Sequence, residues 1–117
     1  MDSISHVDEG DSHQVVVSAS HGGVSSGEYA TRYLLAAVFF NDAGVGKNNA
    51  GIAALAMLDQ IGVPAGTVSH QTARIGDAAD MWENGVLSHL NDHGRGVGMR
   101  SGEPLKDAVG RILDGNL

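Results

Sequence analysis

The chain of 117 residues has no cysteine, two prolines and few aromatic side chains. The lack of cysteine excludes disulfide bonds, thiolate-bound metal centres and a cysteine nucleophile, and it leaves the redox compartment undetermined. Aromatic residues make up 4% of the chain, whereas glycine occurs 17 times. The core must therefore consist of aliphatic side chains and close backbone contacts.

Basic side chains and long apolar runs are also scarce. Seven Lys and Arg against 14 Asp and Glu give a formal net charge of -7; such a surface repels a phosphate backbone, so we expect no nucleic-acid partner. The longest apolar run, residues 33–40, is too short to span a membrane. The first residues lack the basic flank and apolar stretch of a secretory signal. We therefore expect a cytoplasmic protein without a membrane partner.

The length and an apolar content of 42% predict a single α/β domain over residues 14–117. Residues 1–13 are polar, contain four carboxylates and have no apolar run. This composition predicts a mobile acidic N-terminal arm, because polar termini cannot offset their loss of conformational entropy by burial.

After this arm, short β-branched or aromatic runs alternate with segments of helical periodicity. We predict strands at residues 15–17, 38–40, 67–69 and, as a short fourth strand, 96–99. We predict helices at residues 25–37, 51–61, 77–91 and 105–113. Because no turn residue separates the first helix from residues 38–40, the alternative is one long helix that continues through them in place of the second strand. The alternation is typical of βαβ units. It predicts a small three-layer sandwich with a mainly parallel sheet of three or four strands, flavodoxin-like or Rossmann-like.

Several polar side chains are expected to cap these helices. They are Ser25 with Glu28 at capping-box spacing, Asn48 or Asn49, and Asp77. The second predicted helix is apolar on nearly all sides. We therefore expect it to contribute to a homo-oligomer interface, with packing on its own sheet as the alternative.

Parallel sheets bind ligands at the carboxyl ends of their strands, so we expect chemistry in the loops after the first three strands. These loops hold the side chains His21, Asp42, Lys47, His70 and Arg74. The two histidines are suited to proton transfer near neutral pH, and the aspartate can fix the tautomer of one of them. We therefore predict His21, Asp42 and His70 as the catalytic residues.

The same loops offer groups that can bind an anion. Glycines before helix N-termini let a ligand approach backbone amides, and cations and polar side chains add charge and hydrogen bonds. The predicted substrate-binding residues are Ser20, Gly22, Gly23, Asn41, Gly44, Gly46, Lys47 and Arg74. For Arg74 the alternative is an ion pair with Asp77 or Asp80.

These residues predict a hydrolase or lyase that uses general acid–base catalysis on a small anionic metabolite, bearing a carboxylate or a phosphate. The alternative is a non-catalytic anion-binding or regulatory module, or a subunit of an oligomer. No cofactor is predicted, although His21, Asp42 and His70 also offer the donor types of a divalent metal site. His89 and His93 have i, i+4 spacing on the third predicted helix but lack the glutamate of a zinc motif, so we interpret them as an exposed helix end.

Overall fold

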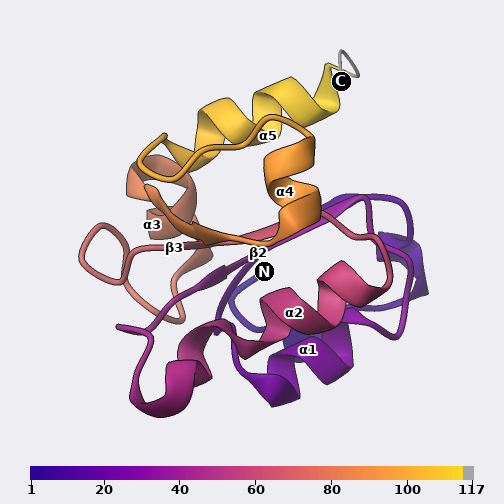
Figure 1. The fold of residues 1–117 in the computed structure, drawn as a ribbon, viewed down its shortest axis with the longest axis horizontal. Helices are drawn as coiled ribbons and strands as arrows, with labels where there is room; N and C mark the ends of the chain where they lie inside the picture. Colours follow the sequence, from indigo (N-terminus) through magenta and orange to yellow (C-terminus); the bar gives the residue numbers. More distant parts are fainter. Residues whose placement is uncertain (115–117) are drawn as a thin grey trace.

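The computed structural model describes residues 1–114, except the side chain at position 48, and has a four-stranded sheet at its centre (Figure 1). Strands that are consecutive in the chain are neighbours in the sheet: β1 (Val15–His21), β2 (Ala37–Asn41), β3 (Ala65–Val68) and β4 (Leu87–Leu90). The first three strands are parallel, whereas β4 is antiparallel to β3. The prediction of a small α/β fold with a mainly parallel sheet is confirmed.

The α-helices lie on two sides of this sheet. They are α1 (Val24–Ala30), α2 (Ala53–Gln60), α3 (Ala78–Asn84), α4 (Asp92–Gly96) and α5 (Leu105–Leu113). Short 3-10 helices also occur: η1 (Ile4–His6), η2 (Glu9–Asp11) and η3 (Lys47–Ile52). In Figure 1, α1 and α2 lie below the sheet, and α3 and α5 lie above it. None of the helices within residues 1–114 has the length and apolar character that crossing a bilayer requires.

The core consists of two apolar clusters that meet different faces of β2. Val38 and Phe40 belong to the cluster that includes residues of α1 and α2. Ala37 and Phe39 belong to the cluster that includes residues of α3 and α5. Every residue of β2 is buried. Because successive side chains of a strand leave opposite faces, such a strand needs apolar cover on both.

α1 is shorter than predicted and begins earlier. It ends at Ala30, and the chain then forms a loop before β2, so the predicted second half of this helix is wrong. Gly23 is its N-cap, and the predicted capping box at Ser25 is also wrong. The Ser26 hydroxyl instead donates to the His21 carbonyl oxygen at 2.5 Å. This bond ties the first turn of α1 to the end of β1.

α2 packs against α1, which accounts for much of its apolar character. Leu55 and Leu58 are buried in the cluster beneath it. Ile52 is the N-cap of α2, after the 3-10 helix η3, so the prediction that Asn48 or Asn49 caps it is wrong. The homo-oligomer interface stays a prediction.

The largest correction concerns the predicted third helix. α3 ends at Asn84, and residues 87–90 form the strand β4, so the helix over 77–91 and the fourth strand over 96–99 are both wrong. Gly85 ends α3: its N–H donates to the Met81 carbonyl, and a Cβ there would overlap that oxygen. The Asp77 cap and the helix over 105–113 are confirmed.

The N-terminal segment packs along β1. Ile4 and Val7 are buried, the Ile4 N–H donates to the Ser20 hydroxyl at 2.8 Å, and the Ala19 N–H donates to the Met1 carbonyl at 3.0 Å. The premise that residues 1–13 bury nothing is therefore wrong for these two apolar side chains. The mobility of the arm stays a prediction.

Candidate functional site

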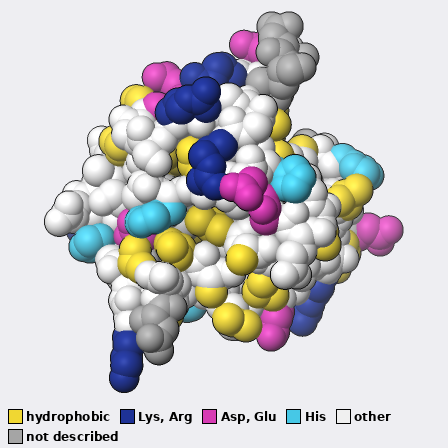
Figure 2. Space-filling model, in the orientation of Figure 1, with side chains coloured by type: hydrophobic (Ala, Val, Ile, Leu, Met, Phe, Trp, Pro, Cys, Tyr) yellow, Lys and Arg dark blue, Asp and Glu magenta, His cyan; other side chains and the backbone are white. Residues whose placement is uncertain are grey.

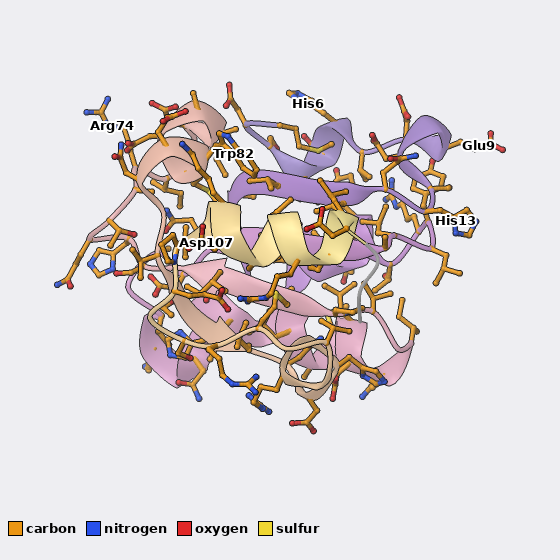
Figure 3. The ribbon with its side chains drawn as sticks, turned by 90° about the horizontal axis from the view of Figure 1, so that it is seen from above. His6, Glu9, His13, Arg74, Trp82 and Asp107 are labelled. Carbon is orange, nitrogen blue, oxygen red and sulfur yellow. The ribbon has the colours of Figure 1, made fainter. Side chains whose placement is uncertain are left out.

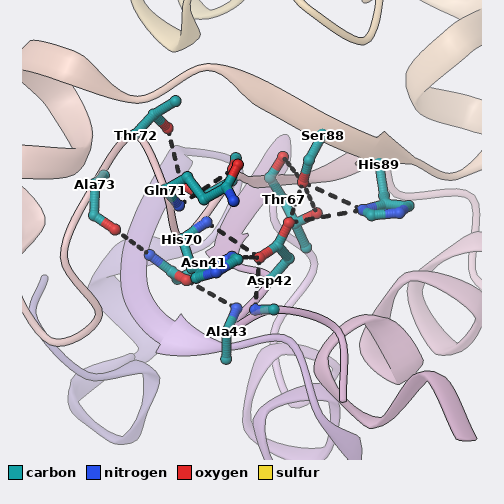
Figure 4. Close-up of polar contacts among 12 residues, drawn as sticks. Asn41, Asp42, Ala43, Thr67, His70, Gln71, Thr72, Ala73, Ser88 and His89 are labelled. Carbon is teal, nitrogen blue, oxygen red and sulfur yellow. Dashed lines mark hydrogen bonds and ion pairs between the residues drawn. The ribbon is translucent and has the colours of Figure 1, made fainter. Parts of the chain in front are cut away.

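A buried carboxylate and three polar side chains meet at the carboxyl end of the parallel strands (Figure 4). We call Asp42, His70, Ser88 and His89 the Asp42 cluster. Asp42 directly follows β2, and 6% of its side chain is exposed. Its Oδ1 accepts the N–H groups of Gly44 at 2.8 Å and His70 at 3.1 Å, and its Oδ2 accepts the Ser88 hydroxyl at 2.7 Å.

These hydrogen bonds determine the charge of Asp42. Burial raises the pKa of the carboxyl, but the hydrogen bonds from Ser88, Gly44 and His70 outweigh burial and bring the pKa below its ordinary value. Asp42 is therefore ionised at neutral pH. An ionised carboxylate only accepts hydrogen bonds, so every polar group that faces it must present a hydrogen.

His70 is held to Asp42 at two points. Besides its backbone N–H, its ring Nδ1 lies 3.3 Å from Asp42 Oδ1. Because Oδ1 is an acceptor, Nδ1 carries the hydrogen and Nε2 is the basic nitrogen of the neutral ring. The His70 side chain is 49% exposed, so solvent and small molecules can reach it. Gly44, at φ +78°, lies under the ring, and a Cβ there would be 3.5 Å from its Cε1.

Ser88 and His89 complete the cluster from β4. The Ser88 hydroxyl lies 2.9 Å from Thr67 Oγ1 and 3.2 Å from His89 Nδ1, and His89 Nδ1 lies 3.9 Å from Asp42 Oδ2. The sequence prediction missed Ser88 and wrongly interpreted His89 as part of an exposed helix end, because it placed both residues in a helix. The available signal was Gly85, a poor helix residue in the middle of that predicted helix.

A cleft of about 380 Å³ lies between α2 on one side and β4 and α4 on the other. Its lining consists of Ile52, Leu55, Ala56, Asp59, Ser88, His89, Leu90, Asn91, Asp92, Arg95 and Ser101. Figure 2 shows apolar, acidic, basic and histidine side chains close together on this face. Ser88 and His89 belong both to the cleft and to the Asp42 cluster, so the cleft is the space next to the buried carboxylate.

His21 lies apart from the cluster. It pairs in register with Asn41 of the adjacent parallel strand, and its ring lies against Gly23, the N-cap of α1. His21 Nδ1 accepts the Gly23 N–H at 3.1 Å. With Ser20 it lines a separate hollow of about 370 Å³. Among the predicted catalytic residues, the structure brings together Asp42 and His70 but not His21.

Several predicted binding residues hold the loops together. The Ser20 hydroxyl accepts the Ile4 N–H. The buried Asn41 amide donates to the Ala73 carbonyl at 2.9 Å, and its oxygen accepts the Ala43 N–H at 2.8 Å. Gly22 approaches the backbone of the next loop so closely that a Cβ would lie 2.6 Å from the Gly51 carbonyl oxygen. These contacts position the sheet edge.

The two predicted cations also lie outside the Asp42 cluster. Lys47 is exposed at the start of η3, after Gly46 at φ +75°. The Arg74 side chain points away from the body of the molecule (Figure 3), and its backbone N–H donates to the Asp80 carboxylate at 2.7 Å. The pKa of Asp80 is lowered chiefly by a hydrogen bond from Asn84. The backbone N–H and the charge of Arg74 lower it further. Arg74 thus contacts Asp80 through its backbone, and the alternative of an ion pair with Asp77 or Asp80 stays a prediction.

Metal-ligand geometry and similarity to known proteins give no further assignment. Among residues 1–114, no group of three or more His, Asp or Glu side chains is arranged to hold a metal ion. No protein-family model, curated protein or solved structure matches the chain. Fold and site together define a small α/β protein in which a buried, ionised aspartate holds a half-exposed histidine at the carboxyl edge of the parallel strands.

Proposed function

We propose that this chain is a hydrolase or lyase that acts by general acid–base catalysis, without a redox cofactor, on a small metabolite bearing a carboxylate or phosphate. His70 is the proton-transfer group and Asp42 orients it. One observation carries this proposal: Oδ1 of the buried, ionised Asp42 accepts both the backbone N–H and the ring Nδ1–H of His70.

This arrangement supplies what a general base needs. The carboxylate holds the ring in the tautomer whose Nε2 can accept a proton, and its negative charge lies beside the imidazolium that forms. The ring is half exposed, while the carboxylate is closed off from solvent. The position also fits, because ligands of open parallel sheets bind outside the carboxyl ends of the strands.

The finer predictions from the sequence remain part of the proposal. α1 and α2 on one side of the sheet and α3 and α5 on the other support a three-layer arrangement, although the strand order β1-β2-β3-β4 differs from that of a flavodoxin-like sheet. The apolar α2 supports a homo-oligomer, which light scattering would test. Lys47 and Arg74 are retained as candidate anion ligands. Replacing either by Ala would weaken ligand binding without much loss of stability if the assignment is correct.

The test is turnover of a panel of small anionic esters, phosphate monoesters and hydroxy acids by the wild-type chain and by His70→Gln. We expect His70→Gln to lower kcat by about 100-fold or more, the usual contribution of a general base, and to keep the wild-type melting temperature.

The matched control is His93→Gln. The His93 backbone N–H donates to Asp59 at 3.0 Å, and its Nδ1 lies 2.7 Å from the same carboxylate. His93 therefore has the same local geometry as His70 but lies outside the Asp42 cluster. We expect its kcat to stay at the wild-type value. Unchanged kcat in His70→Gln would overturn the catalytic role, and binding without turnover by the wild type would favour the anion-binding module.

A further inference from the structure

The cleft next to His89 has no role in the function proposed above. We infer that this cleft binds the substrate and that His89 is a second proton-transfer group, linked to His70 through the carboxylate that they share. The inference rests on the proposed function, since a second proton-transfer group has meaning only if His70 is the first.

The two imidazoles engage opposite oxygens of Asp42. His70 Nδ1 lies 3.3 Å from Oδ1. On the other side, the Ser88 hydroxyl donates its hydrogen to Oδ2 at 2.7 Å. Since that hydrogen is used, the Ser88 oxygen must accept from His89 Nδ1, 3.2 Å away. Both rings therefore direct an Nδ1 hydrogen toward Asp42, one directly and one through Ser88, and both keep Nε2 for a substrate.

Exposure separates the rings from the carboxylate. The side chains of His70 and His89 are 49% and 40% exposed, against 6% for Asp42. A ligand can thus reach either ring but not the carboxylate between them. His89 lines the cleft, and Figure 4 shows the two rings on different sides of Asp42. His70 does not line the cleft, so a substrate that uses both rings must extend from the cleft past Asp42 to reach His70.

The proton transfers balance in either reaction. In hydrolysis, one neutral Nε2 takes a proton from water while the water oxygen bonds to the carbonyl carbon or phosphorus. The other ring, protonated, gives its proton to the leaving oxygen as that bond breaks. In a lyase reaction, one ring takes a proton from carbon and the other protonates the leaving hydroxyl as the double bond forms. The rings exchange protonation states, and proton exchange with water restores them.

The lining of the cleft narrows the substrate class. Ile52, Leu55 and Ala56 form an apolar wall, and Arg95 supplies a cation. Arg95 is fixed by its ion pair with Asp92 and by a hydrogen bond from Nη1 to the Leu90 carbonyl at 2.8 Å, and a guanidinium has further N–H groups for a ligand.

Carboxylates limit the charge that the cleft can accept. Asp59 lines the cleft together with Asp92, so two negative charges stand near the single cation Arg95. This excess of negative charge disfavours a dianion, and a ligand with one carboxylate depends on the Arg95 N–H groups that Asp92 and the Leu90 carbonyl leave free. The volume of about 380 Å³ is at the small end of ligand sites. The substrate class that fits is a small monocarboxylate with a short apolar body.

The first test uses benzoate, a monocarboxylate with an apolar ring, in an NMR titration of the full chain. We expect shifts at Leu55 and His89, and binding about tenfold weaker in Arg95→Gln, which loses a charge-assisted hydrogen bond. Lys106→Gln, which removes a cation paired with Glu83, serves as the charge control. Shifts absent from the cleft up to the solubility limit would overturn the inference.

A second pair of variants blocks the cleft itself. Ala56 and Gln60 are both exposed on α2, but only Ala56 lines the cleft. Ala56→Phe should therefore weaken benzoate binding about tenfold by occupying its space, whereas Gln60→Phe should not. Equal affinity in the two variants would overturn the assignment of the cleft as the ligand site.

The role of His89 is tested by the pH dependence of kcat/KM on the substrate that the panel identifies. The wild type should give a bell-shaped profile, and His89→Asn should lose one limb while keeping an N–H donor toward Ser88. The charged groups that face the rings are Asp42 between them and Asp59, Asp92 and Arg95 around the cleft; all of these remain in the variant.

The outcomes separate this inference from the proposed function. If His70→Gln loses activity but His89→Asn keeps both limbs of the bell-shaped pH profile of kcat/KM, the inference fails and the proposed function stands. If neither variant changes kcat, the proposed function fails. If benzoate binds in the cleft but the wild-type chain turns over nothing on the panel, the cleft stands as a ligand site and both catalytic roles fall.

Discussion

The molecule contains two Asp–His pairs with the same local geometry in different surroundings. In each, one carboxylate oxygen receives both the backbone N–H and the ring Nδ1 of the histidine: Asp42 with His70, and Asp59 with His93. The ring contact is shorter in the second pair, 2.7 Å against 3.3 Å. Contact distance alone would therefore select the wrong pair as the more specialised one.

Burial and further donors distinguish the two pairs. The Asp59 side chain is 26% exposed, and the hydrogen bonds of His93 are the main cause that lowers its pKa. Asp42 is 6% exposed, and its pKa is low although burial raises it, because Ser88, Gly44 and His70 together donate to it. Asp42 is thus a carboxylate kept charged inside the protein, whereas Asp59 is a surface carboxylate with a partner.

The largest difference is expected from removing each charge. Asp42→Asn leaves His70 without the acceptor that fixes its tautomer and places an amide against the Ser88 hydroxyl. We expect kcat to fall by about 1,000-fold and the free energy of unfolding, measured in urea, to fall by about 1–3 kcal/mol.

The matching variant, Asp59→Asn, should leave the urea midpoint near the wild type, because exposed ion pairs contribute little to stability. Equal losses in the two variants would show that burial does not separate the pairs.

The two carboxylates should also differ in how much stability the protein loses at acid pH. The folded-state pKa of Asp42 lies below the ordinary value of 3.8, so ionised Asp42 favours the folded state. Its contribution is complete above the unfolded-state pKa and disappears as the pH falls through the folded-state pKa. Asp42→Asn should therefore lose less stability than the wild type when urea curves at about pH 7 and about pH 3 are compared.

Asp59 follows the same sign, since its pKa is also lowered. Exposure and salt screening should make its contribution to stability smaller. The loss of unfolding free energy between about pH 7 and about pH 3 should therefore be nearly the same in Asp59→Asn as in the wild type. If Asp59→Asn loses less stability on acidification than Asp42→Asn does, Asp59 contributes more to stability than Asp42, contrary to the prediction.

The sequence allowed the Asp42–His70 pair to be predicted for a physical reason. Short β-branched or aromatic runs identify β2 and β3, and the carboxyl ends of adjacent parallel strands lie at one edge. Asp42 and His70 follow these two strands, so their proximity follows from topology alone. No knowledge of side-chain packing was needed.

Register and tertiary packing explain what could not be predicted. β1 has a register irregularity between Val17 and His21, which sequence periodicity does not show and which sets His21 opposite Asn41. Trp82, Val86 and Leu90 have helical spacing, but Leu90 instead pairs with Gly66 in β3. A Cβ at Gly66 would lie 2.8 Å from the Leu90 side chain, so a glycine some 20 residues upstream gives β4 its place, and with it Ser88 and His89.

The smallest expected effect, and the one that isolates a single contact, comes from Ser88→Ala. Ser88 donates to Asp42 Oδ2 at 2.7 Å and is the chief cause that lowers the pKa of this carboxyl against burial. Its removal should raise the pKa of Asp42 and cost about 1 kcal/mol of unfolding free energy. Ser88→Thr, which keeps the hydroxyl and suits a strand, is the conservative control and should restore both.

The measurement for this variant is a carboxyl carbon NMR titration of Asp42 together with urea unfolding. In Ser88→Ala the pKa of Asp42 loses its chief lowering hydrogen bond, whereas the pKa of Asp59 is lowered chiefly by its histidine. The difference between the titration curves of Asp42 and Asp59 should therefore change in this variant. If the titration of Asp42 does not change, the backbone N–H groups of Gly44 and His70 suffice to hold its charge. Burial and the Gly44 N–H would then distinguish the pairs, and the Ser88 link between His89 and the carboxylate would have no measurable effect on the Asp42 charge.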